Sequence, residues 1–524
     1  MTDARIPTFR RGGMGIILLL AVWFVPNILV QNDFRTDDFY LFAVLGDRGL
    51  VWPWESGQYL NFMGFRIVSM VLFLGQLQMF GTHALGYYLV NLIMHVLATL
   101  LCYRLTQTAL NQVIGRTDVV LAMLTALAVG MHADVFYNVL WISNQTETLA
   151  LLLSMLYLWL MLKYLEQGKS EYGVAGLLII AVGFFVKFTV AILPFLFLVI
   201  ALIYQRAGIT TVPRVRILSI AAMGIMVAII LVGIWLFNDR YDEVMLTSVL
   251  PTKLFSVVAI SMICLHPSLA ASVYPLLYEQ RMVALAIGIL LVAVSVYLYG
   301  KLDKNRRAIV PAAALIFLVA VIPRAVHQIA PRINTLQVAV LMVLMAVTLA
   351  YLRPKWATWC MAFVLIAQIA GSAFIIPEWR AETSNMRYKS LLRDEQRMAV
   401  GKSMLLVHQT VFDQYALHFY RTGRFGRDTA LQVSPLRLLR KYGTRSPKEY
   451  RVQRVGDVWE LEACDPRTGF MADTSVASLR WLRMAFLDPL RDYGYRRLRI
   501  SVDDAPNDVR LLVERGFAYE ELPR

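Results

Sequence analysis

The sequence has little charge for its length. Of its 524 residues, 17% are Asp, Glu, Lys or Arg, whereas 58% are hydrophobic. An ordinary soluble domain has about a quarter of its residues charged and about half apolar. This deficit of charge excludes an ordinary soluble domain and predicts an α-helical polytopic membrane protein.

Cysteine is also scarce. Cys102, Cys264 and Cys360 lie in apolar segments, and Cys464 stands alone in the polar C-terminal part. Because no Cys-x-x-Cys pair occurs, a metal pair of that kind and a disulfide framework in the tail are excluded. The sequence also lacks a glycine-rich phosphate or dinucleotide loop, so no nucleotide-binding site is indicated.

The net charge of +15 does not indicate a nucleic-acid partner. The Lys and Arg residues concentrate in the tail and in short loops between apolar runs, of which KLDKNRR (301–307) is the most basic. Such loops are retained in the cytoplasm. We therefore predict a multi-pass protein of the inner (cytoplasmic) membrane with a cytoplasmic N-terminus.

The first apolar run, about 14–30, follows the basic stretch RIPTFRR (5–11). No small-residue cleavage site comes after it, so it is interpreted as a retained span rather than a signal peptide. If its basic end is in the cytoplasm, the run ends on the outer face, and NDFRTDDFYLF (31–41) lies there.

The apolar runs and the alternating loop charges predict about eleven transmembrane helices in a domain formed by residues 1–376. Surface helices on the outer face are expected near 50–82 and 253–272. The first three spans are expected at about 14–30, 84–105 and 118–134. The fourth follows the outer turn 132–147 and ends at YLEQGKSEYG. The remaining spans are expected at about 172–186, 189–205, 217–237, 282–299, 308–322, 333–351 and 356–376.

The polar segment 377–524 is long enough to fold on its own. It is predicted to be a small soluble α+β domain on the extracytoplasmic (periplasmic) side. YRVQRVGDVWELEA (450–463) alternates around a Gly-Asp turn, which indicates a β-hairpin. RRLRISVDD followed by NDVRLLVERGF predicts a strand and then a helix.

Asp37 and Asp38 follow Asp33 in the first outer loop. Adjacent carboxylates can act as a general base or bind a metal, because one is readily neutralised or raised in pKa while its neighbour stays charged. The alternative is a solvated polar loop that closes a span.

Four basic residues on the predicted outer side are not explained by orientation in the membrane: Arg66, Lys187, Arg324 and Arg332. Cations at the membrane edge suit an anionic ligand such as a lipid phosphate. Snorkelling or pairing with outer carboxylates is the alternative for each of them.

Three further outer residues are candidates for substrate binding: His132, Glu147 and His327. A histidine next to a span, such as His95 or His132, is more commonly a hydrogen-bonded structural residue. Glu147 begins a span, where a carboxylate favours the helix N-terminus.

The order of these pieces resembles the GT-C superfamily of polyprenyl-phosphate-sugar-dependent glycosyltransferases. The likeness is carried by the aspartate pair after the first span, GYYLVNLIMH (86–95), HADVFYNVLWISNQTETLA (132–150) and VKFTVAILPFLFL (186–198). It is greatest to the O-mannosyltransferase and aminoarabinose-transferase type, and it covers roughly residues 20–200.

The resemblance implies an inverting glycosyltransferase that acts on the outer face, in synthesis of an envelope glycan or glycoprotein. Its donor would be a polyprenyl-phosphate sugar, and Asp37 or Asp38 would be the catalytic carboxylate. From the placement of the outer cations, we expect Lys187, Arg324 and Arg332 to hold the donor phosphate. The acceptor would be a hydroxyl group of a glycan, a lipid or a protein. No organic cofactor is implied, and a divalent cation is left open.

This sequence departs from the family pattern at two places. Tyr87 and Tyr88 stand where a histidine is expected, and Lys187 is followed by Phe188 where a lysine-glutamate pair is expected. Two other classes stay open: a transporter or flippase for a lipid-linked glycan, and a non-catalytic envelope assembly protein. The sugar, the acceptor and the oligomeric state are not indicated.

Overall fold

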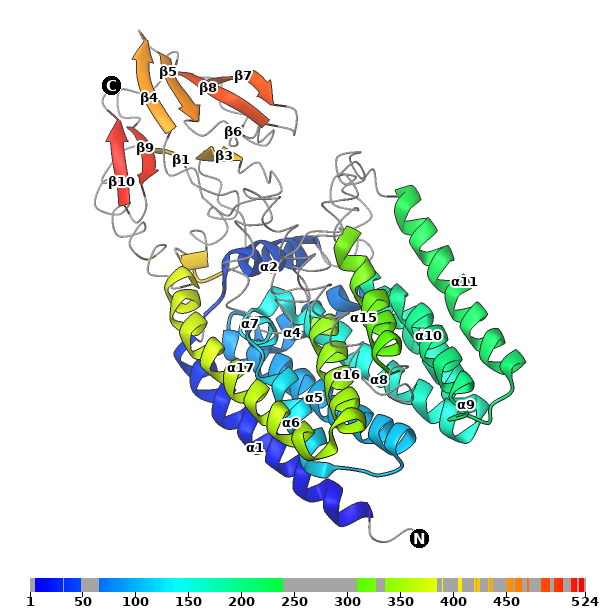
Figure 1. Cartoon of the computed structure of the whole chain (residues 1–524). Helices are drawn as coiled ribbons and strands as arrows, with labels where there is room; N and C mark the ends of the chain where they lie inside the picture. Colours follow the sequence, from blue (N-terminus) through cyan, green and yellow to red (C-terminus); the bar gives the residue numbers. More distant parts are fainter. Residues whose placement is uncertain are drawn as a thin grey trace, which may run out of the picture. The chain divides into compact units, whose positions relative to one another are not determined.

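A computed structural model of the chain forms two compact units (Figure 1). The first, the helical unit, comprises Met1–Asn32 and Leu50–Glu382, and the second, the C-terminal unit, comprises Asp33–Gly49 and Thr383–Arg524. The structure describes residues 5–31, 33–48, 66–238, 309–326, 335–383, 389, 404–407, 419–420, 422–424, 432–433, 435–436, 450–455, 458–463, 469–470, 482–490, 494–502, 510–515 and 518–522.

The helical unit is organised around one long central helix (Figure 1). Its described elements are α1 (Arg5–Gln31), α4 (Ile67–Phe80), α5 (Ala84–Ile114), α6 (Val119–Gly130), α7 (Ala133–Val139), η3 (Ile142–Asn144), α8 (Gln145–Gln167), α9 (Ser170–Phe184), η4 (Phe188–Ile192), α10 (Leu193–Arg206), α11 (Arg214–Asn238), α15 (Ile309–Val326), α16 (Thr335–Leu352) and α17 (Pro354–Thr383). The central helix is α5, which packs against α1, α6, α8 and α16. Tyr87, Tyr88 and Tyr103 of α5 are fully buried.

Short connections make successive long helices antiparallel. Gly115, at the end of α5, has φ +75° and donates its N–H to the Asn111 carbonyl (2.9 Å). Only glycine adopts this left-handed cap without a steric penalty. Asp118 then caps α6 by accepting a hydrogen bond from the Leu121 N–H (3.0 Å). The chain therefore reverses direction within four residues.

The outer surfaces of the helices are apolar. On α17, Trp356, Trp359, Phe363 and Ile366 are exposed at intervals of three or four residues, so they form one face. Exposed apolar faces of this kind suit hydrocarbon rather than water. Among the described residues, five helical segments are long and apolar enough to cross a membrane: Gly12–Val30, Ala84–Ile114, Ile142–Gln167, Thr189–Arg206 and Thr335–Leu352.

The prediction of a largely helical chain with several membrane-crossing segments is confirmed for the described residues. The described parts of the predicted spans outside 239–308 are mostly helical. The apolar helices Val119–Gly130, Ser170–Phe184 and Ile309–Ala320 are shorter than a full crossing. The total of eleven therefore stays a prediction. The predicted span at 282–299 and the surface helix near 253–272 lie outside the described residues. Of the region near 50–82, α4 is described, and its placement on a membrane surface is untested.

Basic residues border one end of the helical unit. Gln112 Nε2 of α5 donates to the Leu162 carbonyl of α8 (2.9 Å), and Thr210 Oγ1 donates to the Leu165 carbonyl (2.7 Å). These bonds bring the connections after α5, α8 and α10 to the same end. Arg116 and Lys169 lie in these connections, and Arg206 and Arg214 lie at the ends of the adjoining helices α10 and α11. By the rule that basic loops stay inside, this end is predicted to be cytoplasmic.

Thiol labelling tests this orientation. Thr82 and Thr117 are both exposed, in the turns that precede and follow α5. After replacement of the four native cysteines, a membrane-impermeant maleimide added to intact cells should label Thr82→Cys and leave Thr117→Cys unlabelled until the membrane is opened. Equal labelling of both before opening would contradict the orientation.

The C-terminal unit contains α2 (Thr36–Arg48) and two sheets (Figure 1). In the first sheet the strand order is β10-β9-β1-β2, and in the second it is β3-β6-β8-β5-β4, with β7 paired to β8. The strands are β1 (Met404–Val407), β2 (Gln432–Val433), β3 (Pro435–Leu436), β4 (Tyr450–Val455), β5 (Val458–Ala463), β6 (Gly469–Phe470), β7 (Leu482–Leu490), β8 (Gly494–Val502), β9 (Arg510–Arg515) and β10 (Ala518–Leu522). The boundary at 377 and the α+β character of the whole segment stay predictions.

Two of the three local predictions for this unit are confirmed. β4 and β5 pair antiparallel with Val455 opposite Val458, as a two-residue Gly-Asp connection requires, and β8 covers the predicted strand. The helix predicted after it is wrong, because residues 510–515 form strand β9. This strand pairs antiparallel with β10, which follows it directly in the sequence, and parallel with β1, which lies about a hundred residues earlier. Both of its edges therefore have hydrogen-bonded partners.

A buried carboxylate joins β5 to β8. Glu460 Oε2 accepts a hydrogen bond from Arg499 Nε (2.8 Å), and Oε1 accepts one from Arg497 Nη1 (3.1 Å). The bond from Arg499, and secondarily the bond from Arg497, lowers the pKa of Glu460 below its usual value. The alternating Glu and Arg residues of these strands therefore form cross-strand ion pairs.

Candidate active site

The structure brings Glu147 and Lys187 together inside the helical unit. Lys187 Nζ forms an ion pair with a carboxylate oxygen of Glu147, and each side chain is only 5% exposed. Removing two charges from water costs several kcal/mol for each ion. A buried pair among apolar helices is therefore unlike a surface ion pair and points to a function.

Local structure fixes both members of the pair. Glu147 lies in the first turn of α8, where the helix dipole stabilises a carboxylate by about 0.3–1 kcal/mol. Lys187 has an extended backbone between α9 and η4. Its N–H donates to the Gly183 carbonyl (2.9 Å), and its carbonyl accepts a hydrogen bond from the Val190 N–H (3.1 Å).

A buried amide network holds the start of α8. Gln76 Nε2 of α4 donates to Gln145 Oε1 (2.7 Å), and Gln145 Nε2 donates back to Gln76 Oε1 (3.1 Å) and to the Tyr87 carbonyl (2.8 Å). Gln145 is two residues before Glu147. The network therefore connects α4 and α5 to the turn that carries the buried carboxylate.

A second amide holds the connection that leads into α8. Asn91 Nδ2 of α5 donates to the carbonyls of Asn138 (2.7 Å) and Val139 (3.0 Å), at the end of α7. Sequence analysis missed Gln76, Gln145 and Asn91. The available signal was the presence of amide side chains inside otherwise apolar helices, since such groups must find hydrogen-bond partners when buried.

His95 and His132 are fully buried. His95 Nε2 lies 3.0 Å from the Gly130 carbonyl, which gives it the structural hydrogen bond that is common for histidines in such positions. His132 lies in the turn between α6 and α7, and its carbonyl accepts the N–H groups of Val135 (3.0 Å) and Phe136 (2.8 Å). A role of His132 in substrate binding is untested.

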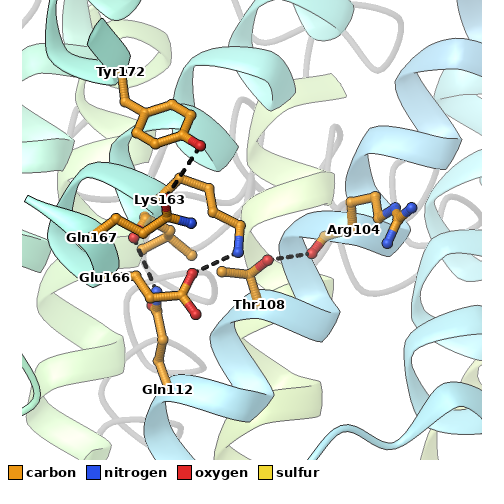
Figure 2. Close-up of polar contacts among 8 residues, drawn as sticks. Arg104, Thr108, Gln112, Lys163, Glu166, Gln167 and Tyr172 are labelled. Carbon is orange, nitrogen blue, oxygen red and sulfur yellow. Dashed lines mark hydrogen bonds and ion pairs between the residues drawn. The ribbon is translucent and has the colours of Figure 1, made fainter. Parts of the chain in front are cut away.

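An ion pair at the other end of α8 provides a contrast (Figure 2). Lys163 Nζ lies 2.5 Å from Glu166 Oε2, but these side chains are 23% and 29% exposed, and they are three residues apart on one helix. Tyr172 donates to Gln167 nearby (3.4 Å), and Thr108 donates to the Arg104 carbonyl (2.9 Å). A partly solvated pair of this kind contributes little to stability.

The predicted catalytic aspartates lie at the start of α2, in the C-terminal unit. Asp38 is fully buried, and its Oδ2 accepts a hydrogen bond from the Arg35 N–H (2.9 Å). This is the reciprocal half of a capping box, in which the third residue of a helix binds the N-cap N–H. Asp37 lies in the same first turn. The hydrogen bond gives Asp38 a capping role and leaves the question of which aspartate is the base to experiment.

The remaining predicted residues are not brought together by the described part of the structure. Arg66 is half-buried directly before α4, and Arg324 lies in α15. Arg332 and His327 lie outside the described residues. Within the described ranges, no group of three or more His, Cys, Asp or Glu residues is arranged to hold a metal ion. The use of a divalent cation is untested.

Residues 70–236 match the family model described as dolichyl-phosphate-mannose-protein mannosyltransferase, a family of the GT-C superfamily. The match runs from α4 into α11, about a third of the chain, and it includes both Glu147 and Lys187. The resemblance to the GT-C superfamily is thereby confirmed for this segment, and it indicates a membrane glycosyltransferase. No curated protein and no solved structure matches the chain.

Proposed function

We propose that the chain is an inverting glycosyltransferase of the GT-C type that transfers a sugar from a polyprenyl-phosphate donor to an acceptor hydroxyl group. The observation that carries the proposal is the buried Glu147–Lys187 pair, which lies inside the segment that matches the mannosyltransferase family. A lipid phosphate is an anion at the membrane edge, and a buried ammonium group is a fitting partner for it.

Lys187 would bind the donor phosphate and stabilise the charge that develops when polyprenyl phosphate leaves. An ammonium group has three N–H donors, so its pairing with Glu147 does not exhaust its hydrogen-bonding capacity. Glu147 would keep Lys187 charged in its apolar surroundings, because a nearby carboxylate favours the ammonium form. Arg324 and Arg332 are proposed as further phosphate ligands on the basis of the sequence.

The reaction would proceed by in-line displacement. The acceptor oxygen forms a bond to the anomeric carbon, the bond from that carbon to the phosphate oxygen breaks, and the leaving phosphate takes the electron pair. One of Asp37 and Asp38 would remove the acceptor proton, with the other orienting the acceptor or capping α2. Since the donor already carries a good leaving group, no nucleotide is required in this step.

The proposed site of action is the outer face of the inner membrane, with a periplasmic C-terminal domain. The distribution of basic loops supports this, because the Glu147 end of α8 is opposite to the end bordered by Arg116 and Lys169. Glycan, lipid and protein acceptors all present hydroxyl groups, and the proposal covers each of them. It includes no nucleic-acid partner.

Reconstitution tests the proposal. The full chain in liposomes, supplied with a panel of polyprenyl-phosphate sugars and an extract of envelope acceptors, should release polyprenyl phosphate and add one sugar mass to an acceptor. Mass spectrometry of envelope glycans from cells with and without the protein should show the same mass difference. Movement of a lipid-linked glycan across the bilayer without any transfer would instead favour the transporter class.

A further inference from the structure

Two consecutive aromatic residues far along the chain pack against the segment that carries the aspartates. Phe419 and Tyr420 belong to the C-terminal unit, as does the aspartate segment, defined as residues 33–48. The Phe419 ring lies 5.5 Å from Phe34 and 5.1 Å from Phe39, between ring centroids. Phe34 and Phe39 are almost completely buried. These edge-to-face and tilted contacts fix the segment beyond simple burial.

Tyr420 also makes a hydrogen bond to the aspartate segment. Tyr420 Oη donates to Asp33 Oδ2 at 2.7 Å, while Asp33 Oδ1 accepts a hydrogen bond from the Phe34 N–H at 2.9 Å. Lys389 Nζ lies 3.7 Å from Asp33 Oδ2 and 5.6 Å from the centre of the Tyr420 ring. Both oxygens of Asp33 are therefore engaged, and one of the bonds comes from a residue 387 positions away.

The constraint on Asp33 is transmitted to α2 over a short distance along the chain. Asp33 is three residues before the first residue of α2, and the Arg35 N–H between them is bound to Asp38 Oδ2 (2.9 Å). Two local hydrogen bonds, at Phe34 and at Arg35, make this turn a single rigid piece. A displacement of Asp33 would therefore displace the first turn of α2, which contains Asp37.

We propose that Tyr420 is a positioning residue for the catalytic aspartate, acting through Asp33, and that this gives the C-terminal domain a role in the transfer step. The inference rests on the proposed function, because it requires Asp37 or Asp38 to act on the acceptor. A general base works only when it is held at the correct place, and a displacement of about 1 Å can cost about 100-fold in rate.

The test uses Tyr420→Phe in the full chain, which removes the hydroxyl group and keeps the ring, so that the aromatic packing and the fold are retained. In the reconstituted transfer assay, kcat should fall about 10- to 100-fold while KM for the lipid donor is unchanged, because the lost interaction concerns the base and not the donor. Tyr172→Phe is the matched control, since Tyr172 is hydrogen-bonded to Gln167 in the helical unit, and it should keep the wild-type kcat.

A second measurement reports on the segment itself. Hydrogen–deuterium exchange of peptides covering residues 33–48 should be faster in Tyr420→Phe, and exchange of peptides from α8 should be unchanged. In a double-mutant cycle, Asp33→Ala removes the acceptor and Tyr420→Phe removes the donor of the same hydrogen bond. The double variant should therefore lose less kcat than the product of the two single losses.

The possible results separate this inference from the proposed function. If Asp37→Asn or Asp38→Asn strongly reduces transfer while Tyr420→Phe keeps a normal kcat, the positioning role is overturned and the proposed glycosyltransferase function stands. Full transfer by both aspartate variants would overturn the assignment of the base and the positioning role with it. A lower kcat together with a higher donor KM and faster exchange throughout the chain would indicate general destabilisation and would also contradict the inference.

Discussion

Joint replacement of the buried pair, Glu147→Leu with Lys187→Met, is expected to leave the chain folded and to raise KM for the lipid donor about 10- to 100-fold. The loss corresponds to one charge-assisted hydrogen bond, about 1.5–3 kcal/mol, and each 1.4 kcal/mol is tenfold in binding. Replacing both members by apolar residues of similar size is often neutral for stability, because no buried charge is left without a partner.

The single variants are expected to behave differently from the pair. Lys187→Ala leaves the Glu147 carboxylate buried without its cation, and breaking a buried pair in this way costs about 3–5 kcal/mol of stability. Loss of activity in Lys187→Ala alone would therefore mix loss of fold with loss of donor binding. The double variant separates the two effects, and its melting temperature in detergent should stay close to that of the wild type.

The other end of α8 supplies matched controls. Lys163→Met with Glu166→Leu removes a Lys–Glu pair from the same helix, but this pair is partly solvated and lies at the predicted cytoplasmic end (Figure 2). Its donor KM should match that of the wild type. If the Glu147→Leu/Lys187→Met chain is folded and binds the donor as tightly as the control, Lys187 does not bind the phosphate.

The positions of the long helices were predictable from the sequence, because apolar runs and basic loops are local signals. Gly115, Asp118 and Gly168 mark connections that the structure places between antiparallel helices. The partner of Lys187 was not predictable in the same way. A glutamate was sought next to Lys187 in the sequence, whereas Glu147 comes from another helix 40 positions earlier. Such a pairing depends on how α8 and the η4 turn pack, and no single window contains that information.

In the C-terminal unit, too, local pairings were predictable from the sequence and distant ones were not. The β4–β5 hairpin was predictable because its pairing is local. Strand β9 was predicted to be a helix because the alternation in RLLVER is short and one of its two partners, β1, lies about a hundred residues earlier. The contact of Tyr420 with Asp33 is more distant still. Sequence analysis placed the aspartates after the first span, but it could not place them in the same unit as residues 383–524.

Asp37→Asn is expected to reduce turnover about 10²- to 10⁴-fold while donor affinity is largely kept, because a general base acts in the transition state rather than in donor binding. Asparagine has nearly the same shape as aspartate, so the fold should be unaffected. If the carboxylate is the base, the acidic limb of the pH profile of kcat should also disappear in this variant, since it reports protonation of that group in the complex.

Asp38→Asn is the matched comparison, one residue away in the same helical turn. Its amide oxygen can still accept the Arg35 N–H, so the capping bond of α2 is retained in part and turnover should fall much less than in Asp37→Asn. Asp38→Ala removes the acceptor and should lower stability by about 0.5–2 kcal/mol, a loss that a melting experiment measures. A larger fall in turnover for Asp38→Asn than for Asp37→Asn would reverse the two roles. Normal turnover in both asparagine variants, in folded and inserted protein, would show that this segment is a solvated and capping loop without a part in catalysis.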